Sequence, residues 1–233
     1  MARTFKALSA LLSYPSRDLQ AAMPELAAAI DGEALLPSGE RIALAPLFAE
    51  LATGDLLDLE ERYVLLFDRT RSLSLNLFEH VHGESRDRGQ AMVDLKQVYE
   101  RSGLKISVGE LPDYLPLFLE YLSTIETAEA QGLLGQARGV IAALGERLEK
   151  RGSAYARVFD GLLALAASAP AAEDVPIADG NSDPDDFAAL DASWEEAGIA
   201  FGPEAAPSGR DRLVAQMRAA KRRPAVAKEY RHG

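Results

Sequence analysis

The chain has 233 residues, of which 48% are hydrophobic and 26% are charged, a balance typical of a globular protein that forms its own core. It contains no cysteine, which excludes disulfides, thiolate zinc sites, cysteine-ligated iron–sulfur clusters and cysteine nucleophiles. The formal net charge of −11 argues against a nucleic-acid-binding protein, because phosphate contacts need a basic surface. It favours a basic or cationic partner.

The first residues do not form a convincing signal peptide. Ser9, Ser13 and the charged residues after Pro15 interrupt the apolar run too early. No stretch of the chain approaches the roughly 20 apolar residues that are needed to span a bilayer. We therefore expect a cytoplasmic protein without stable membrane insertion.

Apolar residues recur at helical spacing up to about residue 168, with good helix formers between them. This pattern predicts an all-α fold, a single helical-bundle domain, and shows neither a strand pattern nor an internal repeat. Pro116 requires that the helix predicted over 111–125 is bent or begins late. A helix capped by Ser85 is expected to stop at Gly103. The other predicted helices span 5–12, 18–29, 55–67, 111–125, 128–150 and 153–167.

The composition changes after the helical region. Ten acidic residues and no Lys or Arg lie between Ala172 and Glu204, whereas eight Lys or Arg and two acids lie between Arg210 and Gly233. We expect a helical domain over 1–170, a mobile acidic linker with a short docking helix over 171–204, and a basic, disordered tail over 205–233. We expect the tail to be a solvated segment attracted to the linker. The alternatives are a nucleic-acid or membrane patch, and a pseudo-leader that occupies an acidic groove.

Few side chains are available for catalysis. The chain has three histidines, and His80 and His82 would point about 200° apart on a helix, too far to share a metal ion. The spacing Glu79-x-x-His82, repeated at Glu229-x-x-His232, is that of carboxylate-bridged metal sites, but the second copy lies in the tail. Nucleophile-elbow, zinc-protease and nucleotide-binding motifs are absent, and Glu60-Glu61 is typical of a solvated face. We expect no catalytic residue, metal or cofactor.

Polar and aromatic residues are crowded between Leu77 and Gln90. One interpretation is a turn at Gly83 followed by a charged first helical turn. The other is the polar edge of a hydrophobic groove that binds an amphipathic peptide with a basic flank.

The segments LFEHVHGESRDRGQAMVDL at 77–95 and ELPDYLPLFLEYLS at 110–123 resemble the NarJ family, the assembly chaperones of respiratory nitrate reductase. LLSYPS at 11–16, the residues preceding Leu77 and the Trp194-Glu195-Glu196 element support the resemblance, which extends from about Phe5 to Gly202. It implies the helical fold of the broader TorD-like redox-enzyme maturation chaperones.

The resemblance also implies a partner, the catalytic molybdenum subunit of nitrate reductase, bound chiefly through its N-terminal peptide. The chaperone would hold the apo-subunit for molybdenum cofactor insertion and iron–sulfur maturation before membrane attachment. Two alternatives stay open: a TorD-like chaperone for another molybdoenzyme, and a metal-dependent helical enzyme that uses carboxylates and histidine. We expect structural roles at the helix junction for His82, Gly83, Arg86, Asp87 and Arg88. We expect peptide contacts from Tyr63, Phe67, Asp68, Phe78, Glu79, His80, Asp113, Tyr114, Phe118 and Glu120.

Overall fold

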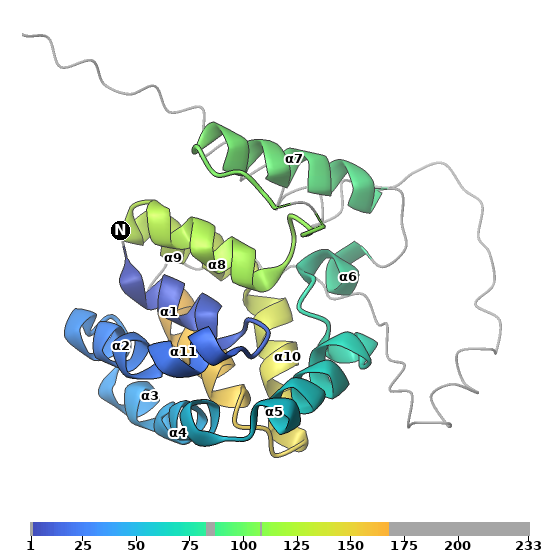
Figure 1. Cartoon of the computed structure of the whole chain (residues 1–233). Coiled ribbons are helices and arrows are strands. Elements are labelled where there is room, and N and C mark those ends of the chain that lie inside the picture. The colour runs from blue at the N-terminus through green and yellow to red at the C-terminus, as the bar shows by residue number, and fades with distance from the viewer. Residues whose placement is uncertain (1, 83–86, 108, 168–233) are drawn as a thin grey trace, which may run out of the picture.

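The computed structural model describes residues 2–82, 87–107 and 109–167, and this part of the chain is all-α (Figure 1). Its single extended pairing is an isolated antiparallel bridge between Asn76 and Tyr114. The helices are α1 (Arg3–Leu11), α2 (Arg17–Glu33), α3 (Ser38–Ala43), α4 (Ala45–Thr53), α5 (Leu56–Tyr63), the π-helix η1 (Val64–Asp68), the 3₁₀-helix η2 (Arg71–Leu73), α6 (Leu77–His82), α7 (Asp87–Arg101), α8 (Leu115–Thr124), α9 (Thr127–Gln136), α10 (Arg138–Lys150) and α11 (Ala156–Ala167).

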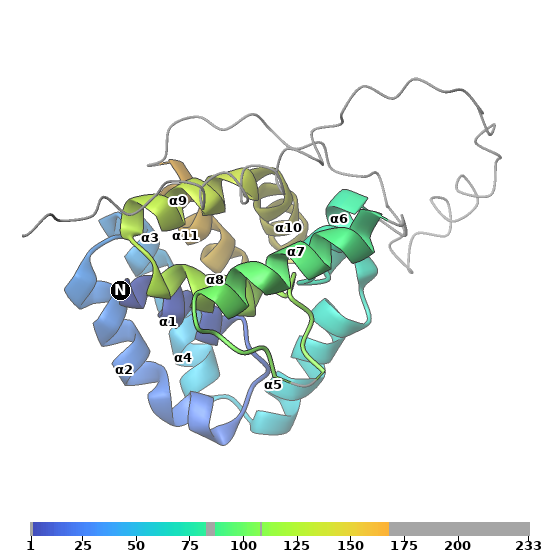
Figure 2. The same cartoon turned by 90° about the horizontal axis from the view of Figure 1, so that it is seen from above.

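The first helix lies at the centre of the bundle. Phe5, Leu8 and Leu11 on α1 are completely buried, and the helix packs between α2 and α8. On the other side of the core α11 packs against both α9 and α10. α7 forms an outer layer beyond α8 (Figures 1 and 2), where Tyr99 of α7 contacts Tyr121 of α8 with ring centroids 5.0 Å apart.

Local sequence explains where several helices begin and end. The Ser16 hydroxyl accepts the Leu19 N–H at 3.1 Å and caps α2, and the Asp55 carboxylate accepts the Leu57 N–H at 3.0 Å and caps α5. Gly103 has a positive φ of 83° just beyond α7, which agrees with the predicted stop. Each of these helix ends is determined by residues close to it in the chain.

Other boundaries differ from the predictions. The prediction of one continuous helix over 128–150 is wrong, because the helix is interrupted at Ala137. The interruption divides it into α9 and α10, which both pack on α11. The helix predicted from 111 begins only at Leu115, since Asp113 and Tyr114 pair with Leu77 and Asn76. α2 contains Pro24 and ends at Glu33, four residues beyond the predicted end at 29. The helices α3 and α4 were not predicted.

The acidic linker, its docking helix and the basic tail lie outside the described residues. So do Gly83, Ser85 and Arg86, and the side chains of His82 and Asp87. Within the described part, no helix is both long enough and apolar enough to cross a membrane.

Candidate functional site

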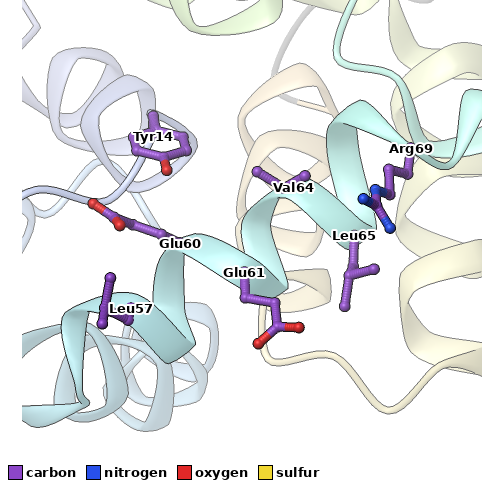
Figure 3. Close-up of a pocket in the computed structure, with 7 residues that line it drawn as sticks. All are labelled: Tyr14, Leu57, Glu60, Glu61, Val64, Leu65 and Arg69. Atoms are coloured by element: carbon purple, nitrogen blue, oxygen red, sulfur yellow. The ribbon is translucent and has the colours of Figure 1, made fainter.

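A pocket of about 260 Å³ opens between the end of α1 and the outer face of α5 and η1 (Figure 3). Tyr14 forms one wall from the loop after α1, and the other lining residues come from the single segment that begins in α5 and ends just after η1. They are Leu57, Glu60, Glu61, Val64, Leu65 and Arg69.

The pocket has several exposed apolar side chains in its lining. Three large hydrophobic side chains that line it, Tyr14, Leu57 and Leu65, are 48%, 74% and 46% exposed. A single exposed hydrophobic residue needs no explanation, but three that gather at one hollow indicate an interaction site.

The π-helix η1 contains a π-turn that determines whether the Arg69 side chain reaches the pocket. The Arg69 N–H donates to the Val64 carbonyl at 2.9 Å, a bond between residues five apart, so one extra residue is accommodated in the helix. Arg69 is the twelfth residue after Leu57 in the chain. Because one residue is extra, Arg69 takes the angular position that the eleventh residue would have in a regular α-helix. Residues separated by 4, 7 and 11 positions share one helical face, which brings Arg69 onto the face of Leu57, Glu61 and Val64.

A network of aromatic residues supports Tyr14 from behind. The Tyr14 ring meets Tyr63 edge-on, with centroids 5.5 Å apart, and Tyr63 also contacts Phe67 at 4.9 Å. The Tyr63 hydroxyl donates to the Leu12 carbonyl at 2.8 Å and lies 2.9 Å from the Tyr114 hydroxyl, which must therefore be the donor in that second bond. Burial raises the pKa of Tyr63, so the hydroxyl stays protonated.

The charged groups of the pocket have no counter-ion within the described part of the chain. Among the residues that the structure describes, none forms an ion pair with Glu60, Glu61 or Arg69, although the neighbouring Arg62 is paired with Glu50. Two carboxylates and one guanidinium therefore border an apolar hollow and are available to a partner.

Most of the residues expected to bind a peptide are buried in this structure. Glu79 is partly buried, Tyr114 is also partly buried, and Asp68 and Glu120 are exposed. The residues that are buried are Tyr63, Phe67, Phe78, His80, Asp113 and Phe118. The structure brings Tyr63, Phe67 and Tyr114 together behind the Tyr14 wall.

Asp113 has a clear structural role. Its carboxylate accepts the Phe78 N–H at 3.0 Å, and its carbonyl accepts the Leu77 N–H at 2.9 Å, so it caps the start of α6 from 35 residues away. Burial raises the pKa of this carboxyl, and the Phe78 N–H and Arg88 partly oppose the shift. The side chain faces the interior in this conformation.

His80 and Glu79 are also engaged within the protein. The His80 Nε2 lies 2.7 Å from the Ser74 carbonyl, and burial lowers the pKa of the imidazole, which favours its neutral form. Glu79 forms an ion pair with Arg88 at 3.0 Å, which fastens α6 to α7. Arg88, for which we expect a structural role at the helix junction, has Glu79 as its described partner.

Glu120 belongs to a different surface. It lies 3.9 Å from Lys6 and lines a second hollow between α1, α2 and α8, together with Arg3 and Glu25. Phe118, two residues earlier, is part of the core. The structure does not bring these two residues to the pocket beside Tyr14.

None of the residues that line this pocket is among the peptide-contact residues predicted from the sequence. Glu60-Glu61 was interpreted as a solvated face, and only the outward positions of Leu57 and Leu65, opposite the buried Leu59 and Tyr63, could have signalled an apolar patch. The place of Tyr14 beside them is a tertiary contact between residues more than 40 positions apart.

The histidine and acidic residues do not assemble into a metal centre in the described part of the chain, where no three such side chains gather. Of the two Glu-x-x-His pairs, the side chain of His82 and the whole copy at Glu229 and His232 lie outside the described residues.

Comparison with known proteins gives one consistent family. The model of the nitrate reductase delta subunit family matches residues 15–160. The chain is 47% identical over 196 residues to the nitrate reductase molybdenum cofactor assembly chaperone NarJ of Escherichia coli K12, covering 83% of each chain. It is 36% identical to the probable chaperone of that name in Bacillus subtilis, over 69% of this chain and 86% of that one.

A solved structure has the same fold. A putative redox enzyme maturation protein from Archaeoglobus fulgidus superposes with a TM-score of 0.51 at 22% identity, over 70% of this chain and 91% of the other. At this identity the likeness concerns the fold alone.

Proposed function

This chain belongs to the nitrate reductase delta subunit family, and we propose that it is a dedicated chaperone for the catalytic molybdenum subunit of a nitrate reductase. In this role it binds the N-terminal segment of that subunit in the cytoplasm. It holds the apo-subunit for molybdenum cofactor insertion and iron–sulfur maturation before membrane attachment. It performs no covalent chemistry of its own.

The observation that carries the proposal is the pocket beside Tyr14. Its exposed apolar side chains match the apolar face of an amphipathic helix, and Glu60 and Glu61 match the basic flank of such a helix. The formal net charge of −11 adds a long-range attraction for a basic segment. A chaperone needs such a binding surface rather than a catalytic centre, because it acts by its preference for the immature state.

The residues predicted from the sequence take two places in this proposal. Tyr63, Phe67 and Tyr114 support the pocket from behind, and Asp68 borders the same segment of the chain. Direct peptide contacts by Phe78, His80, Asp113 and Phe118 require that the bundle opens, because these side chains are buried.

Isothermal titration calorimetry with a synthetic N-terminal peptide of the client tests the proposal. We expect Leu57→Asp to weaken binding at least about tenfold, because it places a carboxylate in an apolar contact. Ile42→Asp on α3 is the matched control, since Ile42 is also 74% exposed but does not line the pocket. Failure of the unmodified protein to bind at micromolar concentration would contradict the proposal.

Two further measurements address the alternatives. N-terminal peptides of other molybdoenzymes, titrated in the same way, identify a chaperone with a different client if one of them binds more tightly. Elemental analysis of the purified protein tests the metal-dependent enzyme, for which a stoichiometric, tightly bound metal is required.

A further inference from the structure

The charges around the pocket are arranged in order along its length. Glu60 and Glu61 lie towards the beginning of the segment that forms the long wall, and Arg69 lies at its end (Figure 3). Arg69 follows Glu61 by eight positions, one of which is the extra residue of η1, so the two lie roughly 10 to 12 Å apart along the helix axis. The apolar side chains of Val64 and Leu65 lie between the two ends.

A helical peptide has a complementary order of charge. Its N-terminal end is positive, from the backbone dipole and from the α-amino group if the chain begins there, and its C-terminal end is negative. About seven or eight residues of such a helix would match the distance between Glu61 and Arg69. The beginning of α5 is itself positive and would repel the positive end of a parallel helix. The carboxylates of Asp55 and Asp58 offset this charge.

On the basis of the proposed function, we infer that the client helix lies in one direction, parallel to α5 and η1, and that Arg69 is the residue that enforces this direction. The positive N-terminal end of the client lies against Glu60 and Glu61. The negative end, or an acidic side chain near it, lies against Arg69. The rest of the client then leaves the chaperone beyond Arg69, on the side of η2 and α6.

The π-turn is what makes this selection possible. In an uninterrupted α-helix, Arg69 would lie about 120° around the axis from Leu57 and away from the pocket face. The bond from the Arg69 N–H to the Val64 carbonyl brings the guanidinium back to that face. Without the turn, the pocket would be bordered only by acidic residues and would not distinguish the two directions.

Paramagnetic relaxation measures the direction. The client peptide carries a nitroxide at its first or at its last residue, and amide signals of the full-length chaperone are recorded in the saturated complex. We expect the N-terminal label to attenuate Leu57 and Glu61 more than Arg69, and the C-terminal label to do the reverse. The opposite order, or equal attenuation at both ends, would overturn the inference and leave the binding function intact.

A charge exchange tests Arg69 itself. Arg69→Glu should weaken binding of the native peptide about two- to fivefold, as expected for an exposed ion pair, and should regain affinity for a peptide with two lysines added at its C-terminal end. Arg138→Glu on α10 is the matched control, because Arg138 is exposed and lies outside the pocket. If Arg69→Glu affects both peptides equally, Arg69 does not select the direction. If neither peptide binds the unmodified protein, the proposed function fails as well.

Discussion

Around α6, acidic side chains are wholly or partly buried and have partners within the protein, whereas on the outer face of α5 and η1 the acidic side chains of Glu60 and Glu61 border an open pocket. Asp113 accepts backbone N–H groups and Glu79 pairs with Arg88, but Glu60 and Glu61 have no counter-ion among the described residues. The same residue types therefore stabilise the fold in one region and remain available for binding in the other. The two regions differ in whether their charged side chains have partners within the described protein. They do not differ in how many such residues the sequence contains.

The strongest test of this contrast is Asp113→Ala. The substitution removes the buried carboxylate that accepts the Phe78 N–H at the start of α6, so we expect the free energy of unfolding in urea to fall by about 2 to 3 kcal/mol. Peptide affinity of the folded protein should change little. Unchanged stability with a large loss of peptide affinity would instead establish Asp113 as a direct contact residue.

The pH dependence of stability offers a second test at Asp113. Burial raises the pKa of its carboxyl, so the native state retains a proton that the unfolded state has already released. The free energy of unfolding should then fall as the pH rises from the ordinary carboxyl value through the raised one, by about 1.4 kcal/mol for each unit of the shift.

Asp113→Asn provides the reference for that measurement, since it keeps an acceptor for the Phe78 N–H but cannot ionise. Urea unfolding of both proteins, from about pH 4 upward, should show the difference growing in favour of the variant. A difference that does not change with pH would contradict the assignment.

Tyr63→Phe tests the support behind the pocket. It removes the bonds to the Leu12 carbonyl and to Tyr114 while keeping the aromatic contacts, and we expect a loss of about 1 kcal/mol in the free energy of unfolding. Tyr14→Ala should show the opposite profile, with little change in stability and a clear loss of peptide affinity. Similar effects of the two substitutions would remove the distinction between support and contact surface.

The smallest expected effect concerns the pocket carboxylates. Replacement of Glu60 and Glu61 by glutamine should weaken peptide binding about two- to fivefold at low salt, and less at high salt, because exposed charges are screened. Glu120→Gln is the comparison, since Glu120 was also predicted to bind the peptide but lies near Lys6 in another hollow. An equal, salt-dependent loss at Glu120 would extend the binding surface to α8.

Much of the fold could be predicted from local pattern. The stripes of α1, α5 and α11, the cap at Asp55 and the stop at Gly103 depend on residues within a few positions of one another. The break at Ala137 could not be predicted, because its cause is the packing of α9 and α10 on α11. The region from 38 to 53 has short helices, whose few turns carry little periodic signal.

By itself, the sequence determined the all-α class and, through its family motifs, the kind of chaperone that the chain resembles, because helical periodicity and motifs are local properties. The tertiary structure alone decided which acids and aromatics are available to a partner. Whether Asp113 faces the interior, or Tyr14 meets the face of Leu57 and Glu61, depends on contacts between distant segments. The position of Arg69 also depends on the folded structure, since one extra residue in η1 rotates Arg69 into the pocket.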